Sequence, residues 1–396
     1  MASSSYDVIV VGMGPAGASA AYKLSRAGLS VLGLEKQTHP RYKVCGGGLS
    51  ARIQEILPSD LESVIEDTVN RMIFSYGPDE QYVVESEKPM AYMVMRSRFD
   101  HWLVEKAQQA GTEVHEGEPV TTLTHRLDGV EVRTSRGHYL AKVVIGADGA
   151  LSVVGQQLFP HRGLQKIPAL ESEIRSESSQ HHRYSKTALI SLNAATKGYG
   201  WIFPKKDGLS IGVGEFVRGM NRPKRSFQQF AQHEPTLTGI EVPLPLGHPI
   251  PVFNRSPGIR NKQWNGGLVH DRAILVGDAG HLVDPLLGEG IYYAVRSGQL
   301  AAANIITALR HSAPCFDGYE RAVIREFGLE FQIASRLGRL VYGVPRSWHR
   351  WAGKTFPGPY QGVLRRYCSM LQGHETYQTL WARILTGIIP PFARRS

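Results

Sequence analysis

The stretch Tyr6-Asp-Val-Ile-Val-Val-Gly-Met-Gly-Pro-Ala-Gly17 decides the fold predicted for this chain. Its β-branched run is typical of a strand that is buried on both faces of a parallel sheet. The glycines Gly12, Gly14 and Gly17 follow that run, and residues 18–27 have a helical pattern. In that order, such glycines permit a tight turn, close approach of a pyrophosphate to the backbone, and close packing of the helix on the strand. The stretch therefore predicts a strand, a phosphate-binding turn and a helix.

A second predicted strand, Leu29 to Leu34, ends at Glu35, 18 residues past Gly17. Glu35 would accept hydrogen bonds from an adenosine ribose, and free amides at the start of the helix would meet phosphate charge. The glycine motif alone is weak, since a glycine-rich turn can form without any nucleotide. Strand, turn, helix, second strand and terminal acid together predict a dinucleotide-binding unit.

Two later segments repeat the design of the first strand, Lys142-Val-Val-Ile-Gly-Ala-Asp-Gly149 and Arg272-Ala-Ile-Leu-Val-Gly-Asp278. Each is a short apolar run that ends in glycine, as expected for a buried parallel strand. We therefore expect one sheet built from the start, the middle and a late part of the chain, with other material inserted between them. The inserted residues 69–95 and 151–267 carry alternating, strand-like patterns, and the pattern turns helical after Leu286.

The pair Gly277-Asp278 distinguishes FAD from a nicotinamide cofactor. A carboxylate at the carboxyl end of a buried strand can accept hydrogen bonds from ribityl hydroxyls, which only the flavin carries. Gly288 and Gly290 then open a long helix, whose amides would face the pyrimidine edge of the flavin and stabilise negative charge there. We predict FAD as the cofactor.

The predicted fold class is α/β: a Rossmann-type FAD-binding domain with an inserted antiparallel β-sheet substrate domain and a helical C-terminal region. We assign residues 1–68, 96–150 and 268–312 to the FAD-binding domain. Residues 69–95 would add strands to the substrate domain formed by 151–267, and residues 313–396 would form the helical, basic C-terminal region.

The composition is that of a globular protein, with 396 residues, 42% hydrophobic and 20% charged residues, and a formal net charge of +10. Three widely spaced cysteines supply neither a disulfide framework nor the ligands of an iron–sulfur cluster. The histidines have no metal-binding spacing, and His181 and His182 are adjacent on a predicted loop, so we expect no metal site. No run reaches the length needed to span a bilayer, and we expect a cytoplasmic protein.

Residues 346–396 hold much of the positive charge, with eight basic residues against one acid, Glu375. Three of the six tryptophans, Trp348, Trp351 and Trp381, lie in the same segment. Aromatic and basic side chains together are typical of a surface on anionic headgroups, so peripheral contact with the inner face of a membrane is one interpretation. A helical tail docked on its own protein is the other. No recognised motif supports binding to nucleic acid.

The motifs resemble the geranylgeranyl reductase family, within the FAD-dependent class that includes aromatic hydroxylases. The resemblance covers most of residues 6–304. It rests on the first glycine motif, on Gly146-Ala-Asp148-Gly149 and on four further segments. These segments are Arg41-Tyr-Lys-Val-Cys45-Gly46-Gly47-Gly48-Leu49, Arg96-Ser-Arg98-Phe99-Asp100-His-Trp-Leu103, Gly198-Tyr199-Gly-Trp201-Ile-Phe203-Pro204-Lys205, and residues 277–294. The resemblance implies reduction of double bonds in geranylgeranyl chains, which occur in chlorophyll precursors, free diphosphates, quinone tails and archaeal lipids.

We assign site residues from the motifs and the resemblance together. The predicted cofactor-binding residues are Gly12, Gly14, Pro15, Ala16, Gly17, Glu35, Lys36, Arg96, Arg98, Val120, Asp148, Gly149, Gly277, Asp278, Gly288, Gly290 and Ile291. The resemblance implies an apolar substrate pocket made by Cys45, Gly46, Gly47, Tyr199, Trp201, Phe203 and Pro204, although simple core packing is the alternative for the aromatic side chains. Cys45 and Tyr199 are the candidate catalytic residues, as proton donors.

Two other functions share these fold signals. A flavin monooxygenase of the hydroxylase type would use oxygen, but Gly155 occupies the position where that type often has an arginine. A membrane-associated binding protein could keep its flavin for structure alone. For the reductase, NADPH and reduced ferredoxin are both candidate electron donors, because relatives of this fold can bind a nicotinamide without a second glycine motif.

Overall fold

The computed structural model describes residues 4–77, 80–159, 166–175, 184–192, 194–195, 197–216, 222–253 and 267–388. The predictions for His181 and His182, and the basic residues Arg394 and Arg395, lie outside these ranges. Within them, no helix is long and apolar enough to cross a membrane.

The chain divides into two compact units. Unit 1 comprises Met1–Lys43, Arg96–Lys166 and Pro249–Gly328, and unit 2 comprises Val44–Met95, Ile167–His248 and Leu329–Ser396. Each unit is therefore assembled from three separate parts of the chain, as the spacing of the motifs predicted for the nucleotide-binding part. The finer division into six segments stays a proposal; the contacts group residues 44–68 with unit 2.

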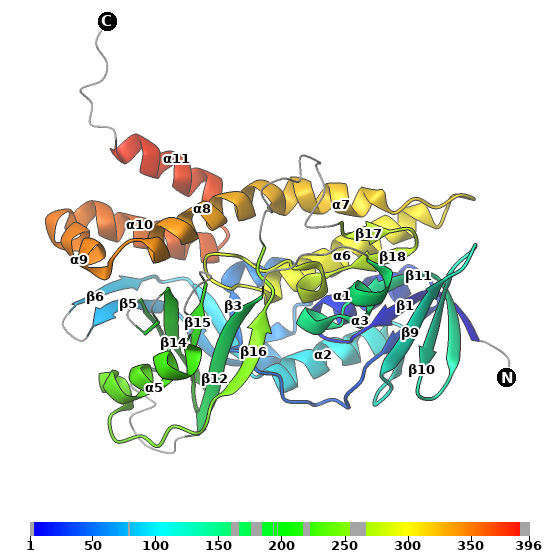
Figure 1. The fold of residues 1–396 in the computed structure, drawn as a ribbon, viewed down its shortest axis with the longest axis horizontal. Coiled ribbons are helices and arrows are strands. Elements are labelled where there is room, and N and C mark those ends of the chain that lie inside the picture. The colour runs from blue at the N-terminus through cyan, green and yellow to red at the C-terminus, as the bar shows by residue number, and fades with distance from the viewer. Residues whose placement is uncertain are drawn as a thin grey trace, which may run out of the picture. The chain divides into compact units, whose positions relative to one another are not determined.

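Unit 1 contains a mixed sheet in the strand order β17-β18-β11-β1-β2-β8, with β10 and β9 continuing from β11. Strand β1 pairs in parallel with β11 and with β2, and β11 pairs in parallel with β18. The three glycine-terminated segments are thus neighbours in one sheet, as predicted (Figure 1). The bounds are β1 Ser4–Val11, β2 Val31–Leu34, β8 Glu113–His115, β9 Val120–His125, β10 Val130–Thr134, β11 His138–Gly146, β17 Val269–His270 and β18 Ala273–Leu275.

The helices of unit 1 include α1 Pro15–Arg26, α2 Arg96–Gln109, α3 Val153–Leu158, α6 Ile291–Ala308 and α7 Asp317–Val323, with a π-helical turn, η6, at Ile324–Gly328 and short 3₁₀ turns η3 at Gly149–Leu151 and η5 at Gly277–Gly280. Helices α1 and α6 pack closely because Gly298 has no side chain. A Cβ atom there would lie 2.2 Å from the carbonyl oxygen of Ala16. This contact joins the helices that begin at the two predicted cofactor motifs.

Unit 2 contains a seven-stranded sheet in the order β16-β12-β15-β14-β13-β5-β6 and a three-stranded sheet in the order β3-β7-β4. Residues 69–95 supply β5 and β6 of the seven-stranded sheet and β7 of the three-stranded sheet. Strand β13 pairs in parallel with β5, while its other neighbour β14 is antiparallel. The bounds are β3 Gly48–Ser50, β4 Ile65–Val69, β5 Arg71–Gly77, β6 Glu80–Glu85, β7 Ala91–Val94, β12 Ile167–Arg175, β13 Thr187–Ser191, β14 Gly198–Lys205, β15 Gly208–Glu215 and β16 Leu246–Ile250.

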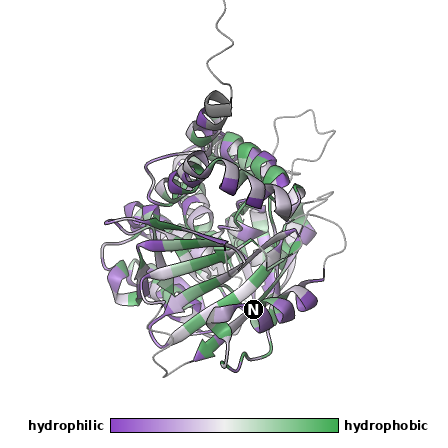
Figure 2. Ribbon diagram, turned by 90° about the vertical axis from the view of Figure 1, so that its left-hand side faces the viewer, coloured by the Kyte–Doolittle hydropathy of each residue, from purple (hydrophilic) through white to green (hydrophobic). Residues whose placement is uncertain are grey.

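The parallel pair refines the prediction of an antiparallel sheet. It arises because β5 precedes the second part of unit 1 in the chain and β13 follows it, so the two strands are not joined by a hairpin, whereas β13 and β14 are close neighbours in sequence. Hydrophobic residues concentrate on the strands (Figure 2). In unit 2 they form a core that includes Ile73, Leu189, Ile202, Ile211 and Phe230.

The end of the chain is helical, as predicted. The helices of unit 2 include α5 Pro223–His233, α8 Leu329–Gly343, α9 Arg346–Thr355, α10 Pro357–Leu371 and α11 Tyr377–Ile388, and its 3₁₀ turns include η1 Ala51–Glu55, η2 Leu61–Val64 and η4 Pro235–Leu237. Helix α9 follows α8 directly, and Pro345 precedes its first residue.

Candidate functional site

The glycine turn between β1 and α1 has the geometry of a phosphate-binding turn. Gly12 has a φ of +93°, and a Cβ atom there would lie 2.5 Å from the carbonyl oxygen of Ala147. A Cβ at Gly17 would lie 1.9 Å from the carbonyl oxygen of Gly12. A Cβ at Gly14, by contrast, would have no neighbouring atom closer than 3.6 Å. The turn is thus tight where strand and helix meet and has room at its second glycine.

The first turn of α1 has no side-chain cap and no acidic residue. Pro15 and Ala16 begin this helix, and the amide of Ala18 bonds to the carbonyl of Gly14. An uncapped helix start presents backbone N–H groups and partial positive charge, which together bind phosphate. This arrangement fits the pyrophosphate of FAD.

Glu35 is buried directly after β2, as the motif predicted. Its Oε2 accepts a hydrogen bond of 3.0 Å from the amide of Met13, and its Oε1 accepts one of 3.2 Å from the amide of Gln37. Two backbone donors hold the carboxylate in one orientation, while each oxygen keeps a further lone pair. The geometry suits an acceptor of ribose hydroxyls. Lys36, the next residue, is exposed.

A buried ionic cluster beside the turn was not predicted. Asp100, wholly buried, accepts bonds of 2.8 and 2.9 Å from Arg96 and lies 3.1 Å from Nη1 of Arg41. Nη1 of Arg41 is buried and has no hydrogen-bond partner of good geometry, and Nη2 is the nearest atom to the vacant Cβ position of Gly14. A buried guanidinium held by carboxylates next to the open glycine fits a phosphate oxygen.

Arg41 was missed as a site residue because only its place in the quoted Arg41–Leu49 segment marked it. An arginine in a loop carries no signal of burial in the sequence. Arg96, by contrast, was predicted at the cofactor, and the structure shows that its guanidinium binds Asp100. Arg98 is exposed and Val120 is half-buried at the start of β9.

Asp148 caps helix α3. Its carboxylate accepts from the hydroxyl of Ser152 at 2.5 Å and from the amides of Val153 and Val154 at 2.6 and 3.1 Å. Burial raises the pKa of Asp148. The contact of Asp148 with the cofactor stays a prediction, since these bonds already explain an acid at this position. The next residue, Gly149, has a φ of +78°.

Gly155 lies inside α3, where the related hydroxylases often have arginine. Its amide donates to Ser152 Oγ at 2.8 Å, and the residue is buried. An arginine side chain would have to leave a buried position here, so the absence of that arginine agrees with the local packing.

Asp278 follows β18 in the 3₁₀ turn η5 and is the strongest candidate for the ribityl chain. Burial raises the pKa of Asp278, and the nearby cations Lys43 and Arg96 act in the opposite direction. Among the described residues, no donor forms a hydrogen bond with the carboxylate of Asp278. The turn before it is fixed by the amide of Gly277, which donates to Ser297 Oγ at 3.0 Å. A half-buried carboxylate that needs donors fits the hydroxyls of a ribityl chain.

The start of α6 repeats the features of α1. Gly288 has a φ of +69°, and Gly290 precedes Ile291 with no side-chain cap. The preceding turn is fixed by Asp284, whose Oδ1 accepts from the amides of Leu286 and Leu287 at 2.7 and 3.0 Å. The backbone amides at this helix start suit the electronegative edge of a flavin. Taken together, the residues of unit 1 fit a bound FAD.

In unit 2, the glycine loop after Cys45 lies against β14. A Cβ at Gly46 would lie 2.8 Å from Nε1 of Trp201 and 3.0 Å from the ring of Phe203. Gly47 has a φ of +64°, and its amide donates to the sulfur of Cys45 at 3.4 Å. The structure thus places Gly46 against Trp201 and Phe203, and the pocket itself stays a prediction.

A buried lysine fixes this loop and was also missed. Lys205, the last residue of β14, donates hydrogen bonds of 2.8 Å to the carbonyl oxygens of Gly46 and Val94. Burial lowers the pKa of Lys205 to about 8, opposed by Cys45 and by the carboxylates of Glu173 and Glu171. The sequence shows Lys205 only as a polar residue that ends a strand.

A row of aromatic rings extends from β14. The ring centroids of Trp201 and Tyr199 are 6.2 Å apart, those of Tyr199 and Phe216 are 5.2 Å apart and stacked, and those of Phe216 and Tyr342 are 5.5 Å apart. Pro204, on the same strand, is buried. Part of the aromatic surface therefore packs on itself, as the core-packing alternative expected.

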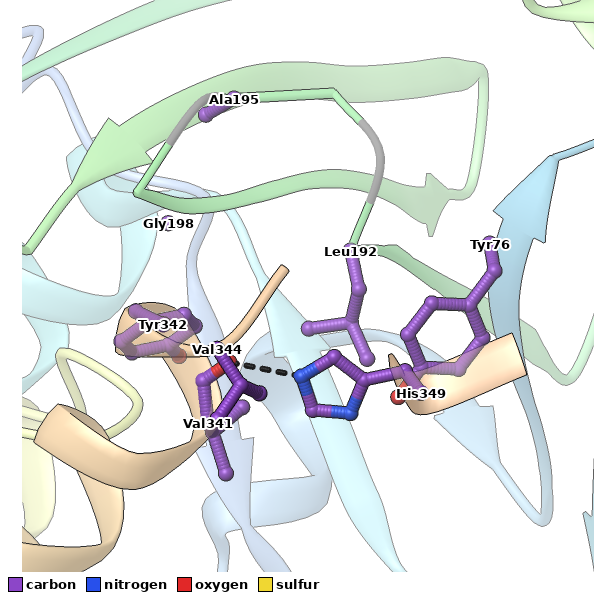
Figure 3. Close-up of a pocket in the computed structure, with 8 residues that line it drawn as sticks. All are labelled: Tyr76, Leu192, Ala195, Gly198, Val341, Tyr342, Val344 and His349. Atoms are coloured by element: carbon purple, nitrogen blue, oxygen red, sulfur yellow. Dashed lines mark hydrogen bonds between the residues drawn. The ribbon is translucent and has the colours of Figure 1, made fainter. Parts of the chain in front are cut away.

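Tyr342 at the end of this row also lines a small pocket (Figure 3), with Tyr76, Leu192, Ala195, Gly198, Val341, Val344 and His349. The imidazole of His349 stacks on Tyr76 at 5.3 Å, and its Nε2 donates to the carbonyl of Val341 at 2.8 Å. The lining combines aliphatic residues with the polar side chains of Tyr76, Tyr342 and His349, so the row of rings leads from β14 to a small pocket of mixed polarity beside α9.

Comparison with known proteins identifies the family. The FAD binding domain family matches residues 5–322. The chain is 30% identical over 348 residues to geranylgeranyl diphosphate reductase of Rhodobacter capsulatus, covering 83% of this chain and 82% of the relative. It is 33% identical over 352 residues to digeranylgeranylglycerophospholipid reductase of Methanocella arvoryzae, covering 82% and 84%. The chain belongs to the geranylgeranyl reductase family of FAD-binding proteins.

A solved structure supports the same conclusion. A geranylgeranyl bacteriochlorophyll reductase-like protein from Thermoplasma acidophilum has a TM-score of 0.74 and 25% sequence identity, covering 87% of this chain and 90% of that one. The family and fold class predicted from the sequence are confirmed. The chain is an FAD-dependent oxidoreductase of the superfamily that joins geranylgeranyl reductases and FAD-dependent hydroxylases.

Proposed function

We propose that this protein reduces carbon–carbon double bonds in a geranylgeranyl chain. The observation that carries the proposal is the contact between the Cys45–Gly47 loop and the aromatic strand β14 in unit 2, because it gathers a thiol and apolar rings beside a glycine backbone. Relatives named as geranylgeranyl and digeranylgeranylglycerophospholipid reductases support it. An isolated alkene develops little charge that polar groups could stabilise early, so an apolar, water-free surface suits it.

The residues of unit 1 would hold the cofactor. We propose that the amides at the start of α1 and the guanidinium of Arg41 bind the pyrophosphate, that Glu35 binds the adenosine ribose, and that Asp278 binds the ribityl chain. The amides at the start of α6, after Gly290, would stabilise negative charge on the reduced ring. Bound and reduced FAD supplies the hydride that the alkene accepts.

The other carbon of the alkene needs a proton, and we propose Cys45 as its donor. Cys45 is half-buried, and its sulfur is oriented by the amide of Gly47. Tyr199, the second candidate, is buried between Trp201 and Phe216. A phenol enclosed between two rings has less freedom to reach a substrate than a thiol on a loop, so Cys45 is the preferred donor.

The electron donor, the carrier of the prenyl chain and the location of the protein complete the proposal. NADPH or a reduced ferredoxin would reduce the cofactor. The geranylgeranyl chain would be carried by a diphosphate or by a lipid, and the protein would act in the cytoplasm or at the inner face of a membrane.

The test is anaerobic photoreduction of the holoprotein with EDTA as the sacrificial electron donor, followed by addition of geranylgeranyl diphosphate. We expect flavin absorbance near ~450 nm to return without oxygen, and mass spectrometry to find two hydrogens added for each double bond reduced. Cys45→Ala should leave the FAD content unchanged and slow the return of absorbance by about 10²-fold or more, the usual effect of losing a general acid. Cys315→Ser, at an exposed cysteine, is the matched control.

Two outcomes would overturn the proposal. Reoxidation that requires oxygen and yields a hydroxylated product would assign the protein to the monooxygenases. A flavin that stays reduced with every prenyl compound tried, yet is tightly bound, would favour the binding protein with a structural flavin.

A further inference from the structure

Helix α9 exposes an aromatic patch, which we define as Trp348, Trp351 and Phe356. The three side chains are 61%, 54% and 52% exposed. Their rings touch edge to face, with centroids 5.9 Å apart for the two tryptophans and 5.8 Å apart for Trp351 and Phe356. Contiguous exposed aromatic side chains on a folded protein mark an interaction surface.

The opposite face of α9 is fixed to its own unit. His349 bonds to Val341 and stacks on Tyr76, as Figure 3 shows. Gly353 lies so close to Tyr82 that a Cβ atom there would be 1.9 Å from the phenolic oxygen. The interpretation of a tail docked on its own protein therefore holds for one face of α9, and the aromatic patch on its other face stays uncovered.

Cations surround the aromatic patch. Lys354 is exposed on α9, and Arg350 is 57% exposed although it forms a 2.8 Å ion pair with Glu80. From Leu329 to Ile388 the chain has eight basic residues and two acidic residues, Glu330 and Glu375. Glu375 lies within ion-pair distance of two of those arginines, Arg366 and Arg383. Because basic residues outnumber acidic ones, the net charge of this segment is positive.

We propose that α9 docks on an anionic phospholipid surface through Trp348, Trp351 and Phe356, with Lys354 facing the headgroups. Tryptophan prefers the interface between headgroups and acyl chains, and an amphipathic helix with flanking cations binds there in the plane of the membrane. The inference rests on the proposed function, because docking on a membrane would bring the protein to a geranylgeranyl chain, which is itself lipid-soluble. The pocket lined by Tyr342 and His349 lies at the inner face of the same helix.

Charge decides against a second copy of the chain as the occupant. In a symmetric dimer the same patch would meet itself, so Lys354 and its neighbouring cations would face identical cations. Like charges across an interface oppose association, whereas anionic headgroups attract each cation by an amount equivalent to about a fivefold change in affinity.

The test is flotation of the FAD-loaded full chain with vesicles of phosphatidylcholine alone or with phosphatidylglycerol. We expect binding to the anionic vesicles, weaker binding at high salt, and little binding to the neutral ones. The double variant Trp348→Ser/Trp351→Ser should bind at least about tenfold more weakly, and Lys354→Gln about fivefold more weakly. Leu127→Ser and Lys224→Gln, at other exposed positions, should bind as the parent does.

Equal binding by the parent and the tryptophan variant, or no binding by the parent, would overturn the inference. So would a dimer in solution that the tryptophan variant dissociates, since the patch would then cover a second copy. FAD content and turnover of a detergent-dispersed prenyl substrate should be the same for all variants. Loss of turnover in every chain would overturn the proposed function and leave the vesicle result standing.

Discussion

Replacing the buried lysine under the glycine loop, Lys205→Met, tests how unit 2 positions Cys45. Lys205 Nζ is 2.8 Å from the carbonyl oxygens of both Gly46 and Val94. Methionine has a similar length and no donor, so the two carbonyls would lose their partner without a change in volume large enough to repack the strand. We expect the loop to open more often while the sheet stays folded.

The size of the effect follows from two opposing contributions. Two hydrogen bonds from a charged donor contribute about 3 to 6 kcal/mol together. Holding the cation in a buried place costs about 3 kcal/mol, because the pKa of Lys205 falls from its ordinary value of 10.5 to about 8. The net loss at pH 7 therefore lies between about 0 and 3 kcal/mol, with a midpoint of about 1.5 kcal/mol, which is roughly a tenfold rise in the open population.

The pH dependence gives a second signature. Between the folded pKa of about 8 and the unfolded value of 10.5, the open state binds more protons than the closed state. The closed state of the parent therefore gains stability as the pH rises, by about 1 kcal/mol from pH 7 to pH 9. Lys205→Met lacks this gain, so the difference between parent and variant should widen by the same amount.

Thiol alkylation measured by mass spectrometry provides the assay. Cys45 is half-buried, Cys315 is exposed and Cys368 is buried. The ratio of Cys45 to Cys315 labelling reports opening of the loop, because the exposed thiol serves as an internal reference for reagent and pH. We expect the ratio to rise about tenfold in Lys205→Met and to be unchanged in Lys197→Met, at an exposed lysine. An unchanged ratio at both pH values would refute the assignment of Lys205 as the residue that positions the loop.

Three further substitutions test the cofactor and substrate assignments. Gly17→Ala should abolish retention of FAD through purification, read from flavin absorbance, since its Cβ would meet the carbonyl of Gly12, whereas Gly362→Ala, with open space around it, should retain the flavin. Glu35→Gln should weaken FAD binding about tenfold in a fluorescence titration, because an amide cannot accept from the amide of Met13 and from ribose equally well. Trp201→Ala should raise the KM for the prenyl substrate by more than it lowers the FAD content, and equal losses of both would contradict its place in the substrate pocket.

Much of the sheet of unit 1 could be predicted because its signal is local. Each of the strands β1, β11 and β18 is a short β-branched run that ends in glycine, and strands buried on both faces carry that pattern wherever they occur in the chain. Their adjacency followed from one further step, that the glycine ends of parallel strands gather at the same edge of a sheet.

The residues that were missed depend on contacts far along the chain. Arg41 is a site candidate because Asp100 holds it and Gly14 leaves room beside it, and Lys205 because the carbonyls of Gly46 and Val94 converge on it. Neither residue has a periodic pattern or a motif of its own. A charged residue in a loop or at a strand end most often faces water, so the sequence favours the wrong environment for both.

The backbone conformation of Gly47 and the burial of Lys205 depend on each other. The backbone of Gly47 has a φ of +64°, and a Cβ there would lie 2.1 Å from the carbonyl of Val94 and 2.7 Å from Lys205 Nζ. A loop that turns this tightly buries the carbonyl of Gly46 without a strand partner, and a buried acceptor without a donor is costly. Lys205 supplies that donor and also donates a hydrogen bond to the carbonyl oxygen of Val94, the last residue of β7. The glycine and the lysine thus form one device that holds the Cys45 loop closed, and their substitutions should be less than additive because either one alone releases the loop.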